Sequence, residues 1–184
     1  MDLNQQIAGR VRQLRTARDL SLEALAERSG VSRSMISLIE RGETSATAVV
    51  LEKLAAALGI PLAGLFEPPA ASVVPLVRKA DQAVWRDSES GYLRRNVSPS
   101  GTLTPIQIVE VAFPAGAHVA YETGRREAPA HQQVWVLGGR IEVTVGDQQH
   151  NLEEGDCLAF ALDRPTAFRN RTRKTARYVV VIVS

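Results

Sequence analysis

The stretch that decides the fold of the N-terminal half is SLEALAERSGVSRSMISLIERG, residues 21–42. Its apolar residues recur at three- and four-residue spacing, which predicts two short helices. Ser21 and Ser32 are suited to cap them, because a serine hydroxyl accepts a hydrogen bond from an amide of the first turn. Gly30 supplies the turn between the helices, and Gly42 lies just past the second. A helix, a short turn containing glycine and a second helix form a geometry that can place the second helix in the major groove of DNA.

The helical spacing extends on both sides of this stretch, as far as Phe66. Caps, glycines and prolines divide it into five segments. We expect these segments at Leu3–Ala17, Ser21–Arg28, Ser32–Arg41 and about Thr47–Leu58, with a last helical turn opened by Pro61. Residues 1–67 are therefore predicted to form a five-helix domain.

A change of composition follows this helical half. EPPAASVVP, residues 67–75, holds three prolines, and proline cannot continue a helix. We interpret residues 68–103 as a linker and a segment that packs on the following domain or on another subunit. In residues 104–184 the apolar residues alternate in short runs such as PIQIVEVAF and RYVVVIV, separated by turns. This pattern predicts an all-β domain, an antiparallel sandwich or barrel.

Composition narrows the class of protein without identifying it. The sequence opens without the layout of a secretory signal and contains no apolar run long enough for a membrane span, so we expect a cytoplasmic protein. The single cysteine, Cys157, excludes an internal disulfide and a cysteine-rich zinc site. Residues 1–67 hold eight Lys and Arg against eight Asp and Glu. Net charge therefore does not establish DNA binding, although a neutral domain can still present one basic face.

The residues from Leu14 to Glu43, followed by LEKLAAALGIPLAGLF, resemble the helix-turn-helix family of phage repressors and their bacterial relatives. The specific matches are Leu25-Ala26, Gly30-Val31-Ser32, the IERG ending at Gly42 and the LAAALGIP close. Leu22 departs from the pattern, because that position is commonly polar in the family. The resemblance implies a sequence-specific regulator that binds double-stranded DNA as a homodimer.

In this family the first residues of the recognition helix face base edges. That assignment carries over to Arg33, Ser34, Ser37 and Leu38. Arg33 is the strongest candidate, because a guanidinium can pair with guanine through two hydrogen bonds. Further candidates, for phosphate contacts that position the protein without reading sequence, are Ser32, Arg41 and Arg10.

Some residues of these helices also have a purely structural interpretation. Arginines spaced along the first helix, Arg10 among them, are equally typical of a solvated helix face. The apolar residues of the predicted recognition helix are expected in the core, against the preceding helix. They are Met35, Ile36 and Ile39.

Residues 104–182 resemble a cupin, a small antiparallel barrel with a pocket between its strands. Many cupins hold a divalent metal there with three histidines and a glutamate. Aligned on Gly139, the glutamate position is Gln132, and the first two histidine positions fall at residues 125–128, which contain no histidine. Aligned on Gly155 and Asn170, the last histidine position is Thr166. The metal-binding set is absent, so we predict neither a metal nor a cofactor.

An amide and a hydroxyl can instead hydrogen-bond an organic molecule. We predict a small-molecule effector bound by Tyr121, Arg126, Gln132 and Thr166, with Val134, Val136 and Phe168 as apolar lining. Two alternatives remain open at this point. The cupin domain could be an enzyme, a metal-dependent oxygenase or isomerase with an accessory DNA-binding domain, or it could serve only for dimerisation.

Overall fold

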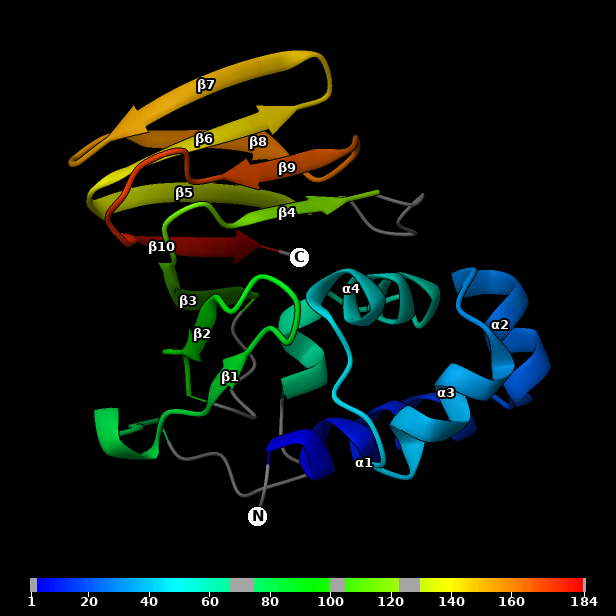
Figure 1. The fold of residues 1–184 in the computed structure, drawn as a ribbon. Helices are drawn as coiled ribbons and strands as arrows, with labels where there is room; N and C mark the ends of the chain where they lie inside the picture. The colour runs from blue at the N-terminus through cyan, green and yellow to red at the C-terminus, as the bar shows by residue number, and fades with distance from the viewer. Residues whose placement is uncertain (1–2, 67–74, 100–104, 123–129, 184) are drawn as a thin grey trace.

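The computed structural model describes residues 3–66, 75–99, 105–122 and 130–183. Its α-helices occupy the N-terminal third, and its strands lie in the rest of the chain (Figure 1). None of the helices within these residues combines the length and apolar character that crossing a bilayer requires.

Four α-helices form the N-terminal domain, and each begins and ends close to its predicted bounds. They are α1 (Leu3–Thr16), α2 (Leu22–Ser29), α3 (Arg33–Glu40) and α4 (Ala48–Ala57). Gly30 takes a left-handed conformation (φ 66°) at the end of α2 and donates its N–H to the carbonyl of Ala26, as a glycine C-cap does. These helices pack around one hydrophobic core. Its fully buried residues include Val11, Leu25, Ile36 and Leu51.

The prediction of a fifth α-helix is wrong. The segment after Pro61 is a single 3₁₀ helix, η1 (Leu62–Phe66). Its five residues lie between Pro61 and the prolines at positions 68 and 69, which leave too little chain for a second α-helical turn. All five η1 residues are nevertheless buried, so the segment forms part of the core.

The strands form two antiparallel sheets. The six-stranded sheet has the order β1-β2-β3-β10-β5-β8, and the four-stranded sheet has the order β4-β9-β6-β7. Their bounds are β1 (Val84–Arg86), β2 (Leu93–Asn96), β3 (Ile106–Phe113), β4 (His118–Tyr121), β5 (His131–Gly138), β6 (Arg140–Val145), β7 (Gln148–Glu153), β8 (Cys157–Ala161), β9 (Thr166–Arg169) and β10 (Ala176–Val183). A short 3₁₀ turn, η2 (Lys79–Asp81), precedes β1.

The cupin-like domain is therefore a two-sheet structure, and the described strands do not close into the predicted barrel. A barrel and a two-sheet sandwich share the same alternation of buried and exposed residues, so the sequence pattern could not separate them. Strands β1 and β2 come from the segment between the two predicted domains and extend the six-stranded sheet beyond β3.

A direct contact between the domains holds the helical domain against the sheets (Figure 1). The carboxylate of Asp87, which follows β1, accepts a hydrogen bond from the N–H of Ala48 at the start of α4 (2.8 Å). Its other oxygen accepts from the N–H (2.7 Å) and the hydroxyl (2.6 Å) of Ser90. Asp87 is 2% exposed. One buried carboxylate thus caps a helix of one domain from a turn of the other.

Aromatic rings extend the same contact. Phe66 of η1 meets Trp85 of β1 edge to face, at 5.7 Å between ring centroids, and Trp85 meets Tyr92 at 5.8 Å. Tyr92 in turn contacts Phe113, between the two sheets. The hydrophobic cores of the two domains are therefore continuous.

We predict that Asp87→Ala lowers the free energy of unfolding by about 1–3 kcal/mol, because it leaves a buried amide of α4 without an acceptor. Asp87→Asn retains an acceptor oxygen and is expected to cost less. Denaturant unfolding of the full chain measures both changes. Asp147→Ala, in the exposed turn before β7, is the control and should change stability by less than about 0.5 kcal/mol. Equal stability of Asp87→Ala and this control would contradict the prediction.

Candidate functional site

The predicted recognition helix is α3, and its N-terminus is formed as the sequence predicts. Ser32 caps it by accepting a hydrogen bond from the N–H of Met35 (3.3 Å), and Ser21 caps α2 through the N–H of Ala24 (3.0 Å). Ile36 and Ile39 are buried, as predicted. They hold one side of α3 against the core and leave its other side exposed.

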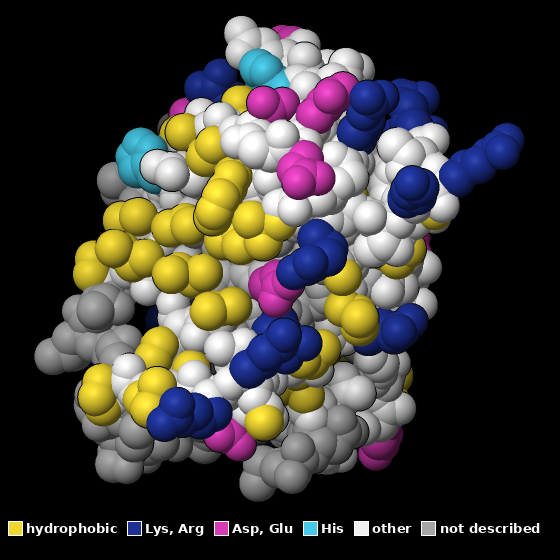
Figure 2. Space-filling model, turned by 90° about the vertical axis from the view of Figure 1, so that its left-hand side faces the viewer, with side chains coloured by type: hydrophobic (Ala, Val, Ile, Leu, Met, Phe, Trp, Pro, Cys, Tyr) yellow, Lys and Arg dark blue, Asp and Glu magenta, His cyan; other side chains and the backbone are white. Residues whose placement is uncertain are grey.

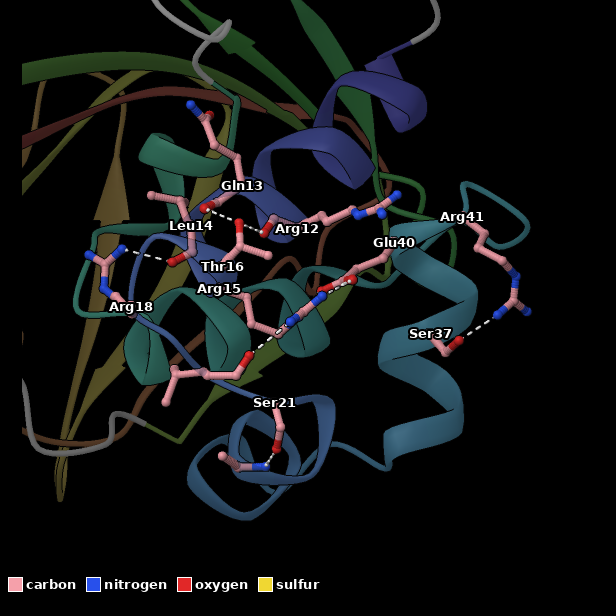
Figure 3. A network of polar contacts seen from close by, with 12 residues as sticks. Arg12, Gln13, Leu14, Arg15, Thr16, Arg18, Ser21, Ser37, Glu40 and Arg41 are labelled. Atoms are coloured by element: carbon pink, nitrogen blue, oxygen red, sulfur yellow. Dashed lines mark hydrogen bonds and ion pairs between the residues drawn. The ribbon is translucent and has the colours of Figure 1, made fainter.

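A buried ion pair fixes α3 against α1 (Figure 3). The Arg15 guanidinium donates to both oxygens of Glu40, at 2.7 and 2.9 Å, and to the carbonyl of Leu20 (2.8 Å). The side chains of Arg15 and Glu40 are only 14% and 8% exposed. The hydrogen bond from Arg15 to Glu40 raises the pKa of Arg15 further, so the guanidinium stays protonated. Arg15 has a structural role, unlike an arginine on a solvated helix face.

The structure brings the predicted base-contacting residues together on α3. Arg33 is 63% exposed and pairs with Glu23 of α2, itself 62% exposed. Such an exposed pair contributes little stability, and the guanidinium can leave it for another acceptor at small cost. Ser32 and Ser34 are exposed beside Arg33, and Ser37 and Leu38 are half-buried one turn further on.

The two predicted phosphate contacts differ in their surroundings. Arg41 is exposed, hydrogen-bonds Ser37 (Figure 3) and pairs with Glu43 at 2.7 Å. Arg10 is half-buried, and its Nε donates to the carbonyl of Gly64 in η1 (3.2 Å). Arg10 therefore already helps to hold η1 on α1.

The expectation that Met35 lies in the core is wrong, because its side chain is 37% exposed. Ile36 and Ile39 define the buried stripe of α3, and Met35 lies at the margin of that stripe. It adds an apolar side chain to the exposed face beside Arg33. The three- and four-residue spacing that predicted a buried residue does not resolve such margins.

A second candidate site is a cavity of about 60 Å³ in the cupin-like domain. Three of the four predicted ligand contacts line it, namely Tyr121, Gln132 and Thr166. The fourth, Arg126, lies outside the described residues. Phe168 also lines the cavity, whereas Val134 and Val136 are buried in the core and are not among the lining residues.

The polar groups of this cavity do not fit the family's metal. At the two described cupin metal positions stand an amide, Gln132, and a hydroxyl, Thr166. Within the described ranges no three His, Cys, Asp or Glu side chains come close enough to form a metal site. Amides and hydroxyls are poor ligands for the transition metals that cupins bind, and good hydrogen-bonding partners for organic molecules.

Two buried charged residues also line the cavity, and the sequence did not indicate either of them. Arg94 of β2 is 6% exposed and Glu52 of α4 is 8% exposed. Arg94 stands two residues after Tyr92, which also lines the cavity. Residues two positions apart in a strand point to the same face of the sheet. This spacing from Tyr92 could have identified Arg94 if GYLRRN had been assigned as a strand.

Three phenols also face the cavity. The hydroxyls of Tyr92 and Tyr121 are 3.2 Å apart, and Tyr178 stacks on Phe168 at 6.0 Å. Burial raises the pKa of Tyr92, Tyr121 and Tyr178 above the ordinary value for tyrosine. Each phenol therefore remains a neutral hydrogen-bond donor at physiological pH.

The wall of the cavity is shared between the two domains. Glu52, Pro61 and Leu62 belong to the helical domain, and the remaining lining residues belong to the cupin-like domain. Helix α4 packs on β4, whose Tyr121 lines the same cavity. A molecule bound there would contact the domain that carries α3.

Comparison with known proteins finds two family matches along the chain. Residues 11–65 match the helix-turn-helix family and residues 111–182 match the cupin domain family. The chain is 27% identical to the HTH-type transcriptional regulator SutR of Escherichia coli over 168 residues, which cover 91% of this chain and 89% of SutR.

Solved structures show the same fold. A crystal structure of an HTH_3 family transcriptional regulator from Vibrio cholerae matches 99% of this chain and 97% of its own, with a TM-score of 0.79 and 24% identity. The fold is also shared, more distantly, with a structure of Fe(II)-HppE bound to an alternative substrate, which has a TM-score of 0.50 and 16% identity over 100% of this chain and 99% of its own.

Proposed function

Since the chain belongs to the helix-turn-helix transcriptional regulators that carry a C-terminal cupin domain, we propose that it regulates transcription in response to a small organic effector bound in the cupin cavity. The observation that carries this proposal is the shared cavity wall, because Glu52, Pro61 and Leu62 of the DNA-binding domain line the same space as Gln132 and Thr166. The chain is expected to act in the cytoplasm.

The proposal favours a binding role over catalysis. An enzyme of the metal-dependent cupin type needs about three or four protein donors around its ion, and Gln132 and Thr166 stand at two of those positions. The likeness to Fe(II)-HppE is one of fold, and a shared fold does not carry the chemistry of a site.

We further propose that α3 reads DNA through Arg33, Ser34, Ser37 and Leu38, with Met35 as an added apolar contact. Arg33 is exposed at the first turn of α3, where this motif contacts base edges. Ser32, Arg41 and Arg10 are proposed to contact phosphates. Replacing Arg10 would test phosphate contact least clearly, because it would also remove the hydrogen bond that holds η1 on α1.

A second copy of the chain is the proposed occupant of an exposed apolar surface. On neighbouring strands of the six-stranded sheet, Ile106 is 46% exposed, Trp135 50% and Val183 41%. Figure 2 shows hydrophobic side chains gathered on one side of the molecule. Monomeric proteins rarely expose a contiguous apolar patch of this kind, and a homodimer would bury it.

On DNA we predict Arg33→Ala to weaken binding to the operator by about 1–3 kcal/mol and to relax specificity, because a base contact is lost. Arg41→Ala should weaken operator and random DNA about equally and lower the salt slope by about one, as expected for a lost phosphate contact. Titrations at several salt concentrations, with an operator selected from random DNA, measure both. Equal loss of specificity in the two variants would contradict this division of roles.

We predict a dimer on DNA, with the two recognition helices about 34 Å apart, or a multiple of that distance, to match successive turns of the duplex. Light scattering of the complex measures its stoichiometry. Trp135→Glu should weaken the dimer, because it places a charge in the apolar interface. The control is Leu76→Glu, at an exposed leucine outside the sheets. A single chain on each operator would contradict the proposal.

A screen of metabolites by thermal unfolding tests the effector site. A ligand at a hundredfold excess over its dissociation constant should stabilise the chain by about 2.7 kcal/mol. Thr166→Phe, which fills the cavity, should abolish this shift, while Thr175→Phe, at an exposed turn, should not. Stoichiometric metal found by elemental analysis, with loss of folding on chelation, would instead support the enzyme.

A further inference from the structure

The cavity contains a buried cation with unused hydrogen-bond donors. Arg94 is only 6% exposed. Neither its Nε nor its Nη2 has a hydrogen-bond partner in the described structure. Buried polar groups are almost always hydrogen-bonded, and exceptions require an explanation. Nε and Nη2 lie on the same edge of the guanidinium, which matches the two oxygens of a carboxylate.

Apart from the carboxylate of Glu52, the rest of the lining suits the remainder of a small acid. Val111, Phe113, Phe168 and Ile182 supply apolar walls. The hydroxyls of Tyr92 and Tyr121 hydrogen-bond each other, which leaves one phenolic O–H as a neutral donor that can stabilise an anion without supplying charge. Ligand pockets of this composition combine an apolar body with a few polar groups that fix orientation.

From this geometry we propose that the cavity binds a small organic acid whose carboxylate accepts two hydrogen bonds from Nε and Nη2 of Arg94. The proposal rests on the proposed function and specifies the chemical class of its effector. It assigns Arg94 as the residue that selects an acid over a neutral or cationic molecule.

Arg94 also lies at the contact between the domains. Its Cζ is 5.3 Å from the centroid of the Phe66 ring, and Phe66 is the last residue of η1. When a carboxylate binds a guanidinium, the attraction between that guanidinium and a neighbouring aromatic ring changes. Binding of the acid therefore acts directly on the contact between the cupin-like domain and the DNA-binding domain.

Matched pairs of probes test the ligand class on the full chain. Butyrate and benzoate are compared with butyramide and benzamide by titration calorimetry at constant ionic strength. We expect each carboxylate to bind at least tenfold more tightly than its amide. Arg94→Gln should remove that preference, whereas Arg95→Gln should leave it within twofold. Arg95 is the next residue on β2 and pairs with Glu110 (3.6 Å), on the opposite face of the sheet from the cavity.

The two tryptophans of the chain allow the coupling to be measured. Trp135→Phe leaves Trp85 as the only tryptophan, and Trp85 contacts Phe66. Butyrate is expected to shift the emission of Trp85 in this variant. It should produce no shift when Arg94→Gln is added, whereas adding Arg95→Gln should leave the shift in place.

Equal binding of carboxylates and amides, absence of carboxylate binding, or the same preference in Arg94→Gln as in Arg95→Gln would overturn the proposal. If Arg94→Gln does not fold, the comparison of acid and amide on the unmodified chain still decides it. If a neutral or cationic metabolite gives the thermal shift that Thr166→Phe blocks, the proposal of an acid ligand is wrong and the proposal of an effector site is supported. If no compound stabilises the chain, both proposals are wrong.

Discussion

The contact made by Asp87 is the constraint on which the arrangement of the two domains depends. A buried carboxylate must be hydrogen-bonded, because burying an unpaired charge costs several kcal/mol. Asp87 meets that requirement only by capping α4 and by holding Ser90 in its own turn. Helix α4 is thereby placed over the cavity, with Glu52 in the wall. The position of the helical domain and the shape of the cavity are consequences of the same hydrogen bonds.

Within the helical domain, the pair between Arg15 and Glu40 extends this constraint to α3. Breaking a buried pair typically costs about 3–5 kcal/mol, so α3 does not move independently of α1. Arg10 connects α1 to η1 through the carbonyl of Gly64, and η1 ends at Phe66 beneath the guanidinium of Arg94. Packed elements therefore form a continuous series from the cavity to the exposed face of α3. Such a series can carry a coupling free energy if binding changes the contact at Arg94.

The success of sequence reasoning varied with the range of the interactions that decide each feature. Caps and turns are local, so Ser21, Gly30 and Ser32 could be assigned from their neighbours in the chain, and the helices end close to the expected residues. Alignment on glycines and Asn170 also gave Gln132 and Thr166, which line the cavity as expected. Asn170 is fully buried and donates to the carbonyls of Phe113, Pro114 and Lys174, which explains why that position anchors the alignment.

Features set by distant parts of the chain could not be read in the same way. Asp87 gives no sign in the sequence that its partner is 39 residues away, and the short strands around Tyr92 and Arg94 acquire their pattern only beside β3. A buried, incompletely bonded arginine also opposes stability, since apolar replacement of buried charges is often neutral or stabilising. Local rules are expected to be broken at functional positions. Arg94 fits that description because a ligand carboxylate would complete its hydrogen bonds and offset the cost of its burial, at the point where the two domains meet.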